Sequence, residues 1–461
     1  MTDHQANEVS ETDAAGSAGG ADPGAEARPG GGPGSPGGAG DPEITVGYRN
    51  YVLGVLFTVY VINFIDRQVL SVFIDPIKAE FGASDTQMGL LVGFAFALFY
   101  TFAGIPIARW ADRGNRRSII ALGLAVWSAM TVASGLARSF VQLALARVFV
   151  GIGEAAGSPP SHSLISDYFP LNKRATALGI YAAGVYVGSA IAYLGGGYLA
   201  ANFDWRVAFY TLGAPGLVFA LVVRFTVREP PRGFSERGAG SAAATTLGET
   251  LRHLLGCRSW VYLMLGSSLL SVLGYGVLMW GYPFFGRVHG LPPLEIGIWL
   301  AAIVGIGGSL GTYGGGKLVD HLGSRDPAWY LRMPALLMLV AMPFGFAFLL
   351  VDGSTRSFAC FFPFYLLSNV YVPAMHTINQ NLAKLRMRAT AAAIMLFIVN
   401  IVGAGAGPLF VGMLNDFYAP RFGDEAIRYS LLTISAAGLV GSLFLWLSSR
   451  TLVADLRRAR E

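Results

Sequence analysis

The sequence predicts an all-α membrane protein in which twelve transmembrane helices form two pseudo-symmetric six-helix bundles. Three observations predict this fold class. Of the 461 residues, 53% are hydrophobic and 13% are charged, whereas a soluble domain carries about 25% charged residues. Hydrophobic segments close to the ~20 residues that a spanning helix needs recur along the chain. Two polar motifs also recur at matched positions of the two halves, which indicates a repeat of six spans.

Residues 1–47 differ in composition from the rest of the chain. They are rich in Gly, Pro and Ala, so they cannot bury enough apolar surface to offset the entropy of ordering. We expect a disordered cytoplasmic tail here. The segment lacks the basic stretch followed by an apolar stretch of a signal peptide, so the first span is expected to be the first helix of the mature protein.

Residues 48–227 and 259–450 are expected to form the two bundles, with six spanning helices in each. Gly and Pro inside these segments are compatible with membrane helices, because neighbouring helices satisfy the freed backbone groups. The expected spans lie at about 50–73, 86–108, 117–137, 140–163, 175–200, 207–227, 259–285, 295–316, 330–350, 357–382, 389–414 and 427–449.

The polar segment 228–258 separates the bundles and is expected to be a cytoplasmic linker. Within it, the stretch from Leu247 to Leu255 predicts a short amphipathic helix on the inner membrane surface. Residues 451–461 are expected to form a second cytoplasmic tail.

The distribution of basic residues predicts the orientation in the membrane. Lys and Arg concentrate in the connections after the second, fourth, eighth and tenth spans, in the linker and at the C-terminus. Because cytoplasmic loops carry such an excess, both termini are expected on the cytoplasmic side of the inner (plasma) membrane. Topology thus explains the net charge of +5, and we expect no nucleic-acid partner.

The chain carries no pattern typical of an enzyme. Its two cysteines, Cys257 and Cys360, stand apart without a CxxC or Cys/His cluster. No nucleophile–base–orienter set, HExxH motif or Walker loop is present in the sequence. We therefore expect no enzymatic activity, no metal and no cofactor.

Four charged residues lie inside expected spans of the N-terminal bundle. Asp66 and Arg67 belong to the first span, with Asp66 about 10 Å inside its exit surface at a rise of ~1.5 Å per residue. A charge inside hydrocarbon costs roughly 2.5–3.5 kcal/mol, so such residues usually face a bundle interior or a wet cavity. Arg147 and Glu154 are seven residues apart in the fourth span and share one helical face. Because the two spans run in opposite directions, we expect the four side chains to converge.

Two interpretations of these charges remain open. In the first they are static, either as buried salt bridges that fix helix register or, for Asp66 and Arg67, as side chains that extend to the membrane surface. In the second they carry protons or recognise substrate, since a carboxylate in a cavity that alternately dries and wets can load and release a proton. Glu154 is then expected to be the proton carrier, and Asp66 to stay ionised beside an arginine. Arg67 or Arg147 would grip a phosphate group bidentately.

Other polar or amphipathic side chains inside the spans are candidate substrate contacts, although such residues more often make hydrogen bonds between helices. The spans of the C-terminal half have few charges and many Phe, Met, Trp and Leu, which suits an amphipathic substrate and equally suits helices that face lipid. The candidates are Asn63, Tyr100, Tyr186, Tyr193, His376 and Asn400.

The loops after the second and eighth spans share a motif, at 108–117 and 316–325. Both resemble the cytoplasmic signature G-x-x-x-D-R/K-x-G-x-R/K of the major facilitator superfamily, although Ala108 and Asn115 replace glycines in the first copy. The resemblance covers about 48–450 and implies the major facilitator fold. It also implies a conformational clasp in which an Asp at a helix end lies beside Arg side chains. The expected clasp residues are Asp112, Arg113, Arg116, Arg117, Gly316, Asp320, Gly323 and Arg325.

Further motifs resemble the spinster lipid-transporter branch of this superfamily. They are N-F-I-D-R at 63–67, R-V-F-V-G-I-G-E-A at 147–155 and S-D-Y-F-P at 166–170. This resemblance implies transport of sphingosine-1-phosphate or lysophospholipids. In the fifth span Tyr193 and Leu194 stand where antiporter members have Gly-Pro, so that motif does not support antiport.

Together these observations predict a secondary active transporter that works by alternating access. Its expected substrate is an amphipathic lipid, and its expected partners are protons and membrane lipids, with the protein acting as a monomer. Drug or organic-anion efflux by the same fold is the alternative within transporters. A non-transporting membrane sensor is an alternative of another class.

Overall fold

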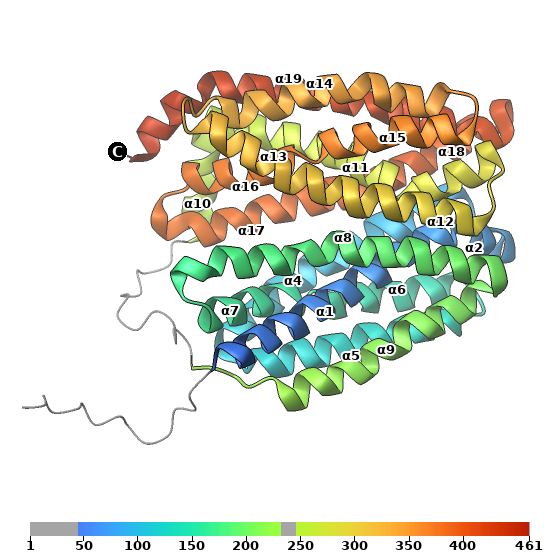
Figure 1. Cartoon of the computed structure of the whole chain (residues 1–461), viewed down its shortest axis with the longest axis horizontal. Coiled ribbons are helices and arrows are strands. Elements are labelled where there is room, and N and C mark those ends of the chain that lie inside the picture. Colours follow the sequence, from blue (N-terminus) through green and yellow to red (C-terminus); the bar gives the residue numbers. More distant parts are fainter. Residues whose placement is uncertain (1–44, 232–245, 461) are drawn as a thin grey trace, which may run out of the picture. The chain divides into compact units, whose positions relative to one another are not determined.

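The computed structural model describes residues 45–231 and 246–460, and within these ranges every regular element is a helix (Figure 1). The expected tail 1–47 therefore lies almost wholly outside the described residues. We call the two sets of helices the N-half and the C-half. The face that the basic residues predict to be extracytoplasmic is called the outer face.

The N-half begins with α1, which starts behind the N-cap Thr45, and it ends with α9. A short helix, α2, follows α1 on the outer face. The second spanning segment is assembled from α3, a π-helical turn η1 and α4. Its elements are α1 (Val46–Val72), α2 (Ile74–Phe81), α3 (Asp85–Gly89), η1 (Leu90–Ala95), α4 (Phe96–Arg113), α5 (Arg116–Gly135), α6 (Phe140–Glu154), α7 (Ser158–Tyr168), α8 (Leu171–Asn202) and α9 (Trp205–Thr226).

The C-half begins with α10, a ten-residue helix with an N-terminal capping box formed by Thr246 and Glu249. Two π-helical turns, η2 and η4, again interrupt long helices. Its elements are α10 (Leu247–Gly256), α11 (Arg258–His289), α12 (Pro293–Ala302), η2 (Ile303–Gly307), α13 (Gly308–Gly323), α14 (Trp329–Leu350), α15 (Ser354–Ser368), α16 (Tyr371–Leu382), η3 (Leu385–Met387), α17 (Arg388–Val399), η4 (Asn400–Ala406), α18 (Gly407–Phe422), η5 (Gly423–Glu425) and α19 (Ala426–Arg460).

The described residues contain the twelve predicted membrane crossings. Eleven helical stretches are long and apolar enough to cross a bilayer, and the last of them, Arg388–Arg458, comprises two crossings. These two are divided at Gly423, whose positive φ of 55° is a backbone conformation that glycine adopts without steric penalty. The twelve-helix prediction is confirmed.

Several helices extend beyond the predicted spans because their ends are capped by polar residues outside the apolar windows. The second crossing begins at Asp85 behind a capping box formed by Ser84 and Gln87. The sixth begins at Trp205, where Asp204 accepts a hydrogen bond from the amide of Arg206. Hydrophobicity marks the part of a helix that crosses the membrane, whereas these caps decide where the helix starts.

The two halves meet closely near the outer face. There α8 packs against α12, and α18 packs against α3. A side-chain carbon on Gly412 of α18 would stand 2.2 Å from the carbonyl oxygen of Asp85, and one on Gly297 of α12 would stand 2.4 Å from that of Tyr193. Glycine is required at these positions because the helix backbones touch. Figure 1 shows α2, α12 and α18 at one end of the helices and α7, α10 and α16 at the opposite end.

Candidate functional site

The structure brings the four predicted charged side chains together between α1 and α6. The side chain of Arg67 is 11% exposed and that of Glu154 is fully buried. Asp66 is also fully buried, and Arg147 is 2% exposed. The cluster contains two acids and two bases, so its formal charges cancel.

Arg67 and Glu154 form the ion pair of this cluster. Arg67 Nη2 lies 2.9 Å and Nε 3.3 Å from Glu154 Oε2, and both donate to it. The guanidinium also lies over three aromatic rings, at 5.0 Å from Phe64, 4.7 Å from Phe96 and 5.0 Å from Tyr100. These cation–π contacts stabilise a positive charge where water is scarce. Asn63, one of the predicted substrate contacts, lies beside Glu154.

Asp66 lies close to this pair without joining it. Neither carboxylate oxygen has a hydrogen-bond partner among the described residues, although the side chains of Trp127 and Thr131 approach it from α5. Arg147 Nη2 donates instead to the backbone carbonyl of Asp66 over 3.2 Å, while Arg147 Nε and Nη1 have no partner in the described part of the chain. The carboxylate of Asp66 is therefore the unpaired acid of the cluster.

The structure differs from the expected pairing of the two acids. We expected Asp66 to lie ionised beside an arginine, but Glu154 is the acid that forms the ion pair. Residue spacing along the helix axis predicts depth in the membrane. It does not predict that neighbours such as Asp66 and Arg67, about 100° apart around the helix, face α5 and α6 respectively.

Two of the predicted tyrosines join the halves in this conformation. The hydroxyls of Tyr186 in α8 and Thr312 in α13 are hydrogen-bonded. Tyr193 donates to the carbonyl of Leu278 in α11 over 2.5 Å and accepts from Gln68 over 2.6 Å. In this structure both tyrosines therefore make hydrogen bonds between helices, which was the alternative to a contact with substrate. Gln68 was not among the predicted residues, although a polar residue one position after Arg67 was a visible signal.

The other predicted contact residues are less constrained. His376 in α16 is exposed, and Asn400, the first residue of η4, is partly buried. No hydrogen bond involving the side chain of either residue is found in the described part of the structure, and neither residue lies in the cluster of α1 and α6.

Among the residues that the structure describes, the first clasp motif makes its ion pairs through one residue, Arg116. Arg116 is 1% exposed and forms an ion pair with Asp167 of α7, and another with Glu229, over 2.7 Å. The amide of Arg117 donates to Glu229 Oε2 over 2.9 Å. Asp112, expected to be the acidic partner, is exposed, as is Arg113. The acids that hold Arg116 are distant in sequence, so the local motif did not indicate them.

The second copy of the motif packs differently. A side-chain carbon on Gly323 would stand 2.2 Å from the ring of Tyr330, which explains glycine there. Arg325 Nη2 lies 3.5 Å from His321 Nε2, and Asp320 lies beside the hydroxyl of Tyr330. Gly316 faces Pro373 at ordinary contact distance.

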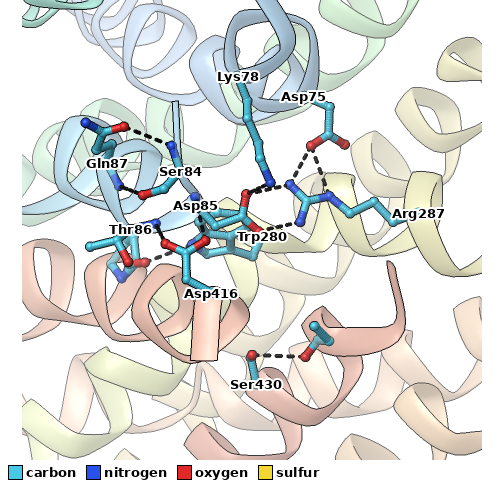
Figure 2. Close-up of polar contacts among 12 residues, drawn as sticks. Asp75, Lys78, Ser84, Asp85, Thr86, Gln87, Trp280, Arg287, Asp416 and Ser430 are labelled. Atoms are coloured by element: carbon cyan, nitrogen blue, oxygen red, sulfur yellow. Dashed lines mark hydrogen bonds and ion pairs between the residues drawn. The ribbon is translucent and has the colours of Figure 1, made fainter. Parts of the chain in front are cut away.

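A second charged cluster, on the outer face, was not predicted. Arg287 of α11 forms ion pairs with Asp75 and Asp85 of the N-half, both over 2.5 Å (Figure 2). None of these three residues belongs to a motif that was singled out in the sequence. They line a pocket of about 380 Å³ together with residues of α18 such as Asp416.

Comparisons with known proteins identify the class of protein that carries these sites. The family model described as Major Facilitator Superfamily matches residues 56–408. An MFS-type efflux pump of Mycolicibacterium smegmatis is 33% identical over 408 residues, which is 88% of this chain and 93% of that protein. Protein spinster homolog 3 of Danio rerio is 26% identical over 454 residues, which is 89% of this chain and 87% of that protein.

Solved structures agree with this result. The crystal structure of a bacterial homologue of the human lysosomal transporter spinster, inward-facing and unoccupied, is 34% identical with a TM-score of 0.81, covering 89% of this chain and 99% of that one. A D-xylose-proton symporter at 18% identity and a TM-score of 0.69 shares the fold.

The chain belongs to the Major Facilitator Superfamily and is a multi-pass membrane transporter. Within that superfamily its relatives include spinster proteins.

Proposed function

We propose that this transporter works by alternating access and moves an amphipathic anionic lipid, such as a lysophospholipid or a sphingosine-1-phosphate-like molecule, coupled to protons. The observation that carries the proposal is the cluster of Asp66, Arg67, Arg147 and Glu154 inside the N-half. Three of these side chains are almost fully buried, and Arg67 alone is partly exposed. Ionisable residues in membrane helices usually belong to substrate or proton pathways.

The geometry suggests how substrate and proton would be linked. An anionic headgroup that binds the guanidinium of Arg67 competes with Glu154, which already accepts two N–H groups from it. A proton on Glu154 weakens that ion pair and releases Arg67 for the headgroup. Headgroup binding and proton loading on Glu154 therefore favour each other.

Asp66 takes a different part in this proposal. Its buried carboxylate lacks a hydrogen-bond donor among the described residues, and an unpaired buried charge is unfavourable. Asp66 is therefore a second carboxylate that can take up a proton. Arg147, which contacts the backbone of Asp66, holds α6 against α1 at this depth.

The first prediction concerns proton coupling. We expect Glu154→Gln to reduce lysolipid transport in proteoliposomes under an imposed pH gradient to the rate seen without a gradient, because glutamine cannot load a proton. Asp66→Asn is expected to weaken the gradient dependence as well. Asp352→Asn is the matched control, because it neutralises an exposed carboxylate in the loop between α14 and α15. Unchanged gradient dependence in both test variants would refute coupling through this cluster.

The second prediction concerns the headgroup. Arg67→Ala is expected to weaken binding of a phosphate-bearing lysolipid about 10- to 100-fold, since charge-assisted hydrogen bonds contribute ~1.5–3 kcal/mol. Binding of the dephosphorylated analogue should change much less. Both affinities are measured on purified protein by the ligand-dependent rise of the melting temperature. Equal losses for the two ligands would show that Arg67 does not recognise phosphate.

Drug or organic-anion efflux is the second candidate function. The observation that favours it is the 33% identity to a protein named as an MFS-type efflux pump. The same thermal-shift assay distinguishes the candidates when lysolipids, drugs and organic anions are compared. Stabilisation by drugs and by no lysolipid would favour efflux.

A further inference from the structure

The pocket on the outer face has the size of a small-molecule site. Its volume of about 380 Å³ falls within the range of roughly 300–1,000 Å³ that ligand pockets occupy. Residues of α2, α3, α11, α18 and η5 line it. Among the residues that the structure describes, no group of three His, Cys, Asp or Glu could hold a metal ion. The pocket is thus suited to an organic molecule rather than to a single ion.

Two acids of the pocket are matched by its two bases. Arg287 of α11 donates to Asp75 over 3.0 and 2.5 Å and to Asp85 over 2.5 and 3.0 Å. Lys78 of α2 lies 2.6 Å from Asp85, and Figure 2 shows both bases pointing to this carboxylate. The four hydrogen bonds of Arg287 occupy four of the five N–H groups of a guanidinium. Because these donors are already used, the pocket disfavours an anionic ligand.

Two further acids leave the pocket with a negative charge. Asp416 of α18 and Asp424 of η5 also line it, so four aspartates face one lysine and one arginine and the formal charge is −2. Asp416 accepts the amides of Asp85 and Thr86 over 3.0 and 2.8 Å (Figure 2). These amides belong to the first turn of α3, where N–H groups lack partners within the helix. A carboxylate has about four acceptor positions, so Asp416 caps α3 and still offers acceptors to a ligand.

The other free acceptors come from Asp424 and Asp75. Asp424 is exposed and has no hydrogen bond or ion pair within the described part of the chain. It follows Gly423, whose positive φ turns the chain between α18 and α19 beside the pocket. Both hydrogen bonds to Asp75 end on Oδ1, so its Oδ2 is open. The pocket therefore presents unused carboxylate oxygens and few unused donors.

Asn415 of α18 provides an observation that is independent of these charges. It lines the pocket and is 1% exposed. Neither the oxygen nor the nitrogen of its side chain has a hydrogen-bond partner among the described residues. A buried amide without partners is unfavourable, and almost every buried polar group in a stable protein has one. A ligand with N–H groups would supply a donor to the oxygen of Asn415.

We propose that this pocket binds a small aliphatic cation with primary ammonium groups, of the diamine or polyamine class, at Asp416, Asp424 and Asn415. An ammonium group has three donors and no acceptor, which matches free carboxylate oxygens and the amide oxygen. Two ammonium groups match the formal charge of −2. The inference goes beyond the proposed function, because it requires neither a lipid substrate nor proton coupling.

The test uses putrescine with the full chain, purified in an uncharged detergent. Binding is measured from the rise of the melting temperature with putrescine concentration. Tetramethylammonium, which has no N–H group, and Mg²⁺ are compared at the same ionic strength. We expect a saturable rise with putrescine and a clearly smaller rise with either of the other cations.

Variants assign the binding to this pocket. Asp424→Asn and Asn415→Leu are each expected to weaken putrescine binding about 3- to 10-fold, which corresponds to one hydrogen bond or one exposed ion pair. Glu425→Gln is the matched control. It removes a negative charge next to Asp424, but Glu425 is paired with Arg428 and is not among the residues that line the pocket. The affinity of this control should stay unchanged.

The proposal is overturned by the absence of a saturable rise with putrescine, or by an equal rise with tetramethylammonium or Mg²⁺. Unchanged affinity in Asp424→Asn, or an equal loss in Glu425→Gln, would also overturn it. Should Asn415→Leu fail to fold, Asp424→Asn decides, because its side chain is exposed and has no partner to lose within the described residues. These measurements use no lysolipid and no pH gradient, so their failure and a failure of the proposed function are distinguishable.

Discussion

Asp66 and Arg67 are consecutive residues of α1 with opposite surroundings. Arg67 is paired with Glu154 and covered by aromatic rings, whereas Asp66 is buried without a hydrogen-bond partner among the described residues. A single position along a helix thus separates a satisfied charge from an unsatisfied one. In stable proteins almost every buried polar group has a partner, so Asp66 is the residue at which a functional explanation is most needed.

The tolerance of a glycine position for a larger side chain also depends on its surroundings, and Gly412 of α18 provides a test. Gly412→Ala is expected to lower the melting temperature, since its side-chain carbon would stand 2.2 Å from the carbonyl oxygen of Asp85 and overpacking costs ~1–3 kcal/mol. Gly314→Ala is the control, because a side-chain carbon there meets no atom within 4 Å. It should be neutral or slightly stabilising. Equal melting temperatures for the two variants would contradict the close backbone contact.

At the scale of single elements, α10 is a helix with one buried side and one exposed apolar side. Leu247, Leu251 and Leu255 recur every fourth residue and are 64%, 37% and 56% exposed, while Leu254 is fully buried. The ring of His253 lies within hydrogen-bond distance, 3.0 Å, of the carbonyl of Leu382 at the end of α16. One side of α10 is therefore fixed to the C-half, and an apolar stripe remains uncovered. We propose that this stripe lies on the inner membrane surface.

Fluorescence quenching by spin-labelled lipids tests this placement of α10. A fluorophore at Leu251→Cys should be quenched strongly in reconstituted protein, and one at Arg252→Cys should be quenched less. Both residues are exposed, and they point about 100° apart around the helix. Native Cys257 and Cys360 are replaced by Ser in both variants. Equal quenching at the two positions would place the stripe away from lipid.

At the scale of the whole transporter, the contacts between the halves concentrate toward the outer face. The ion pairs of Arg287, the cap from Asp416 and the glycine contacts of α12 and α18 all lie there. The contacts at the outer face and the central charged cluster are built from different residues, so each can be examined by separate variants.

Much of the architecture was predictable because it depends on local sequence. The number of crossings, the division into two halves and the charged residues inside spans follow from hydrophobic length, a repeated motif and composition. Helix ends were less predictable, since caps such as Ser84 and Asp204 lie outside the hydrophobic windows.

The sequence by itself determined which residues enter the membrane and at what depth, because a helix advances by a constant rise per residue. Only the tertiary structure decided which charged residues are partners. The pairing of Arg67 with Glu154, of Arg116 with Asp167 and of Arg287 with Asp85 each joins residues from different helices. Such pairs depend on how each helix is rotated about its axis and on which neighbours it meets, and helix packing decides both.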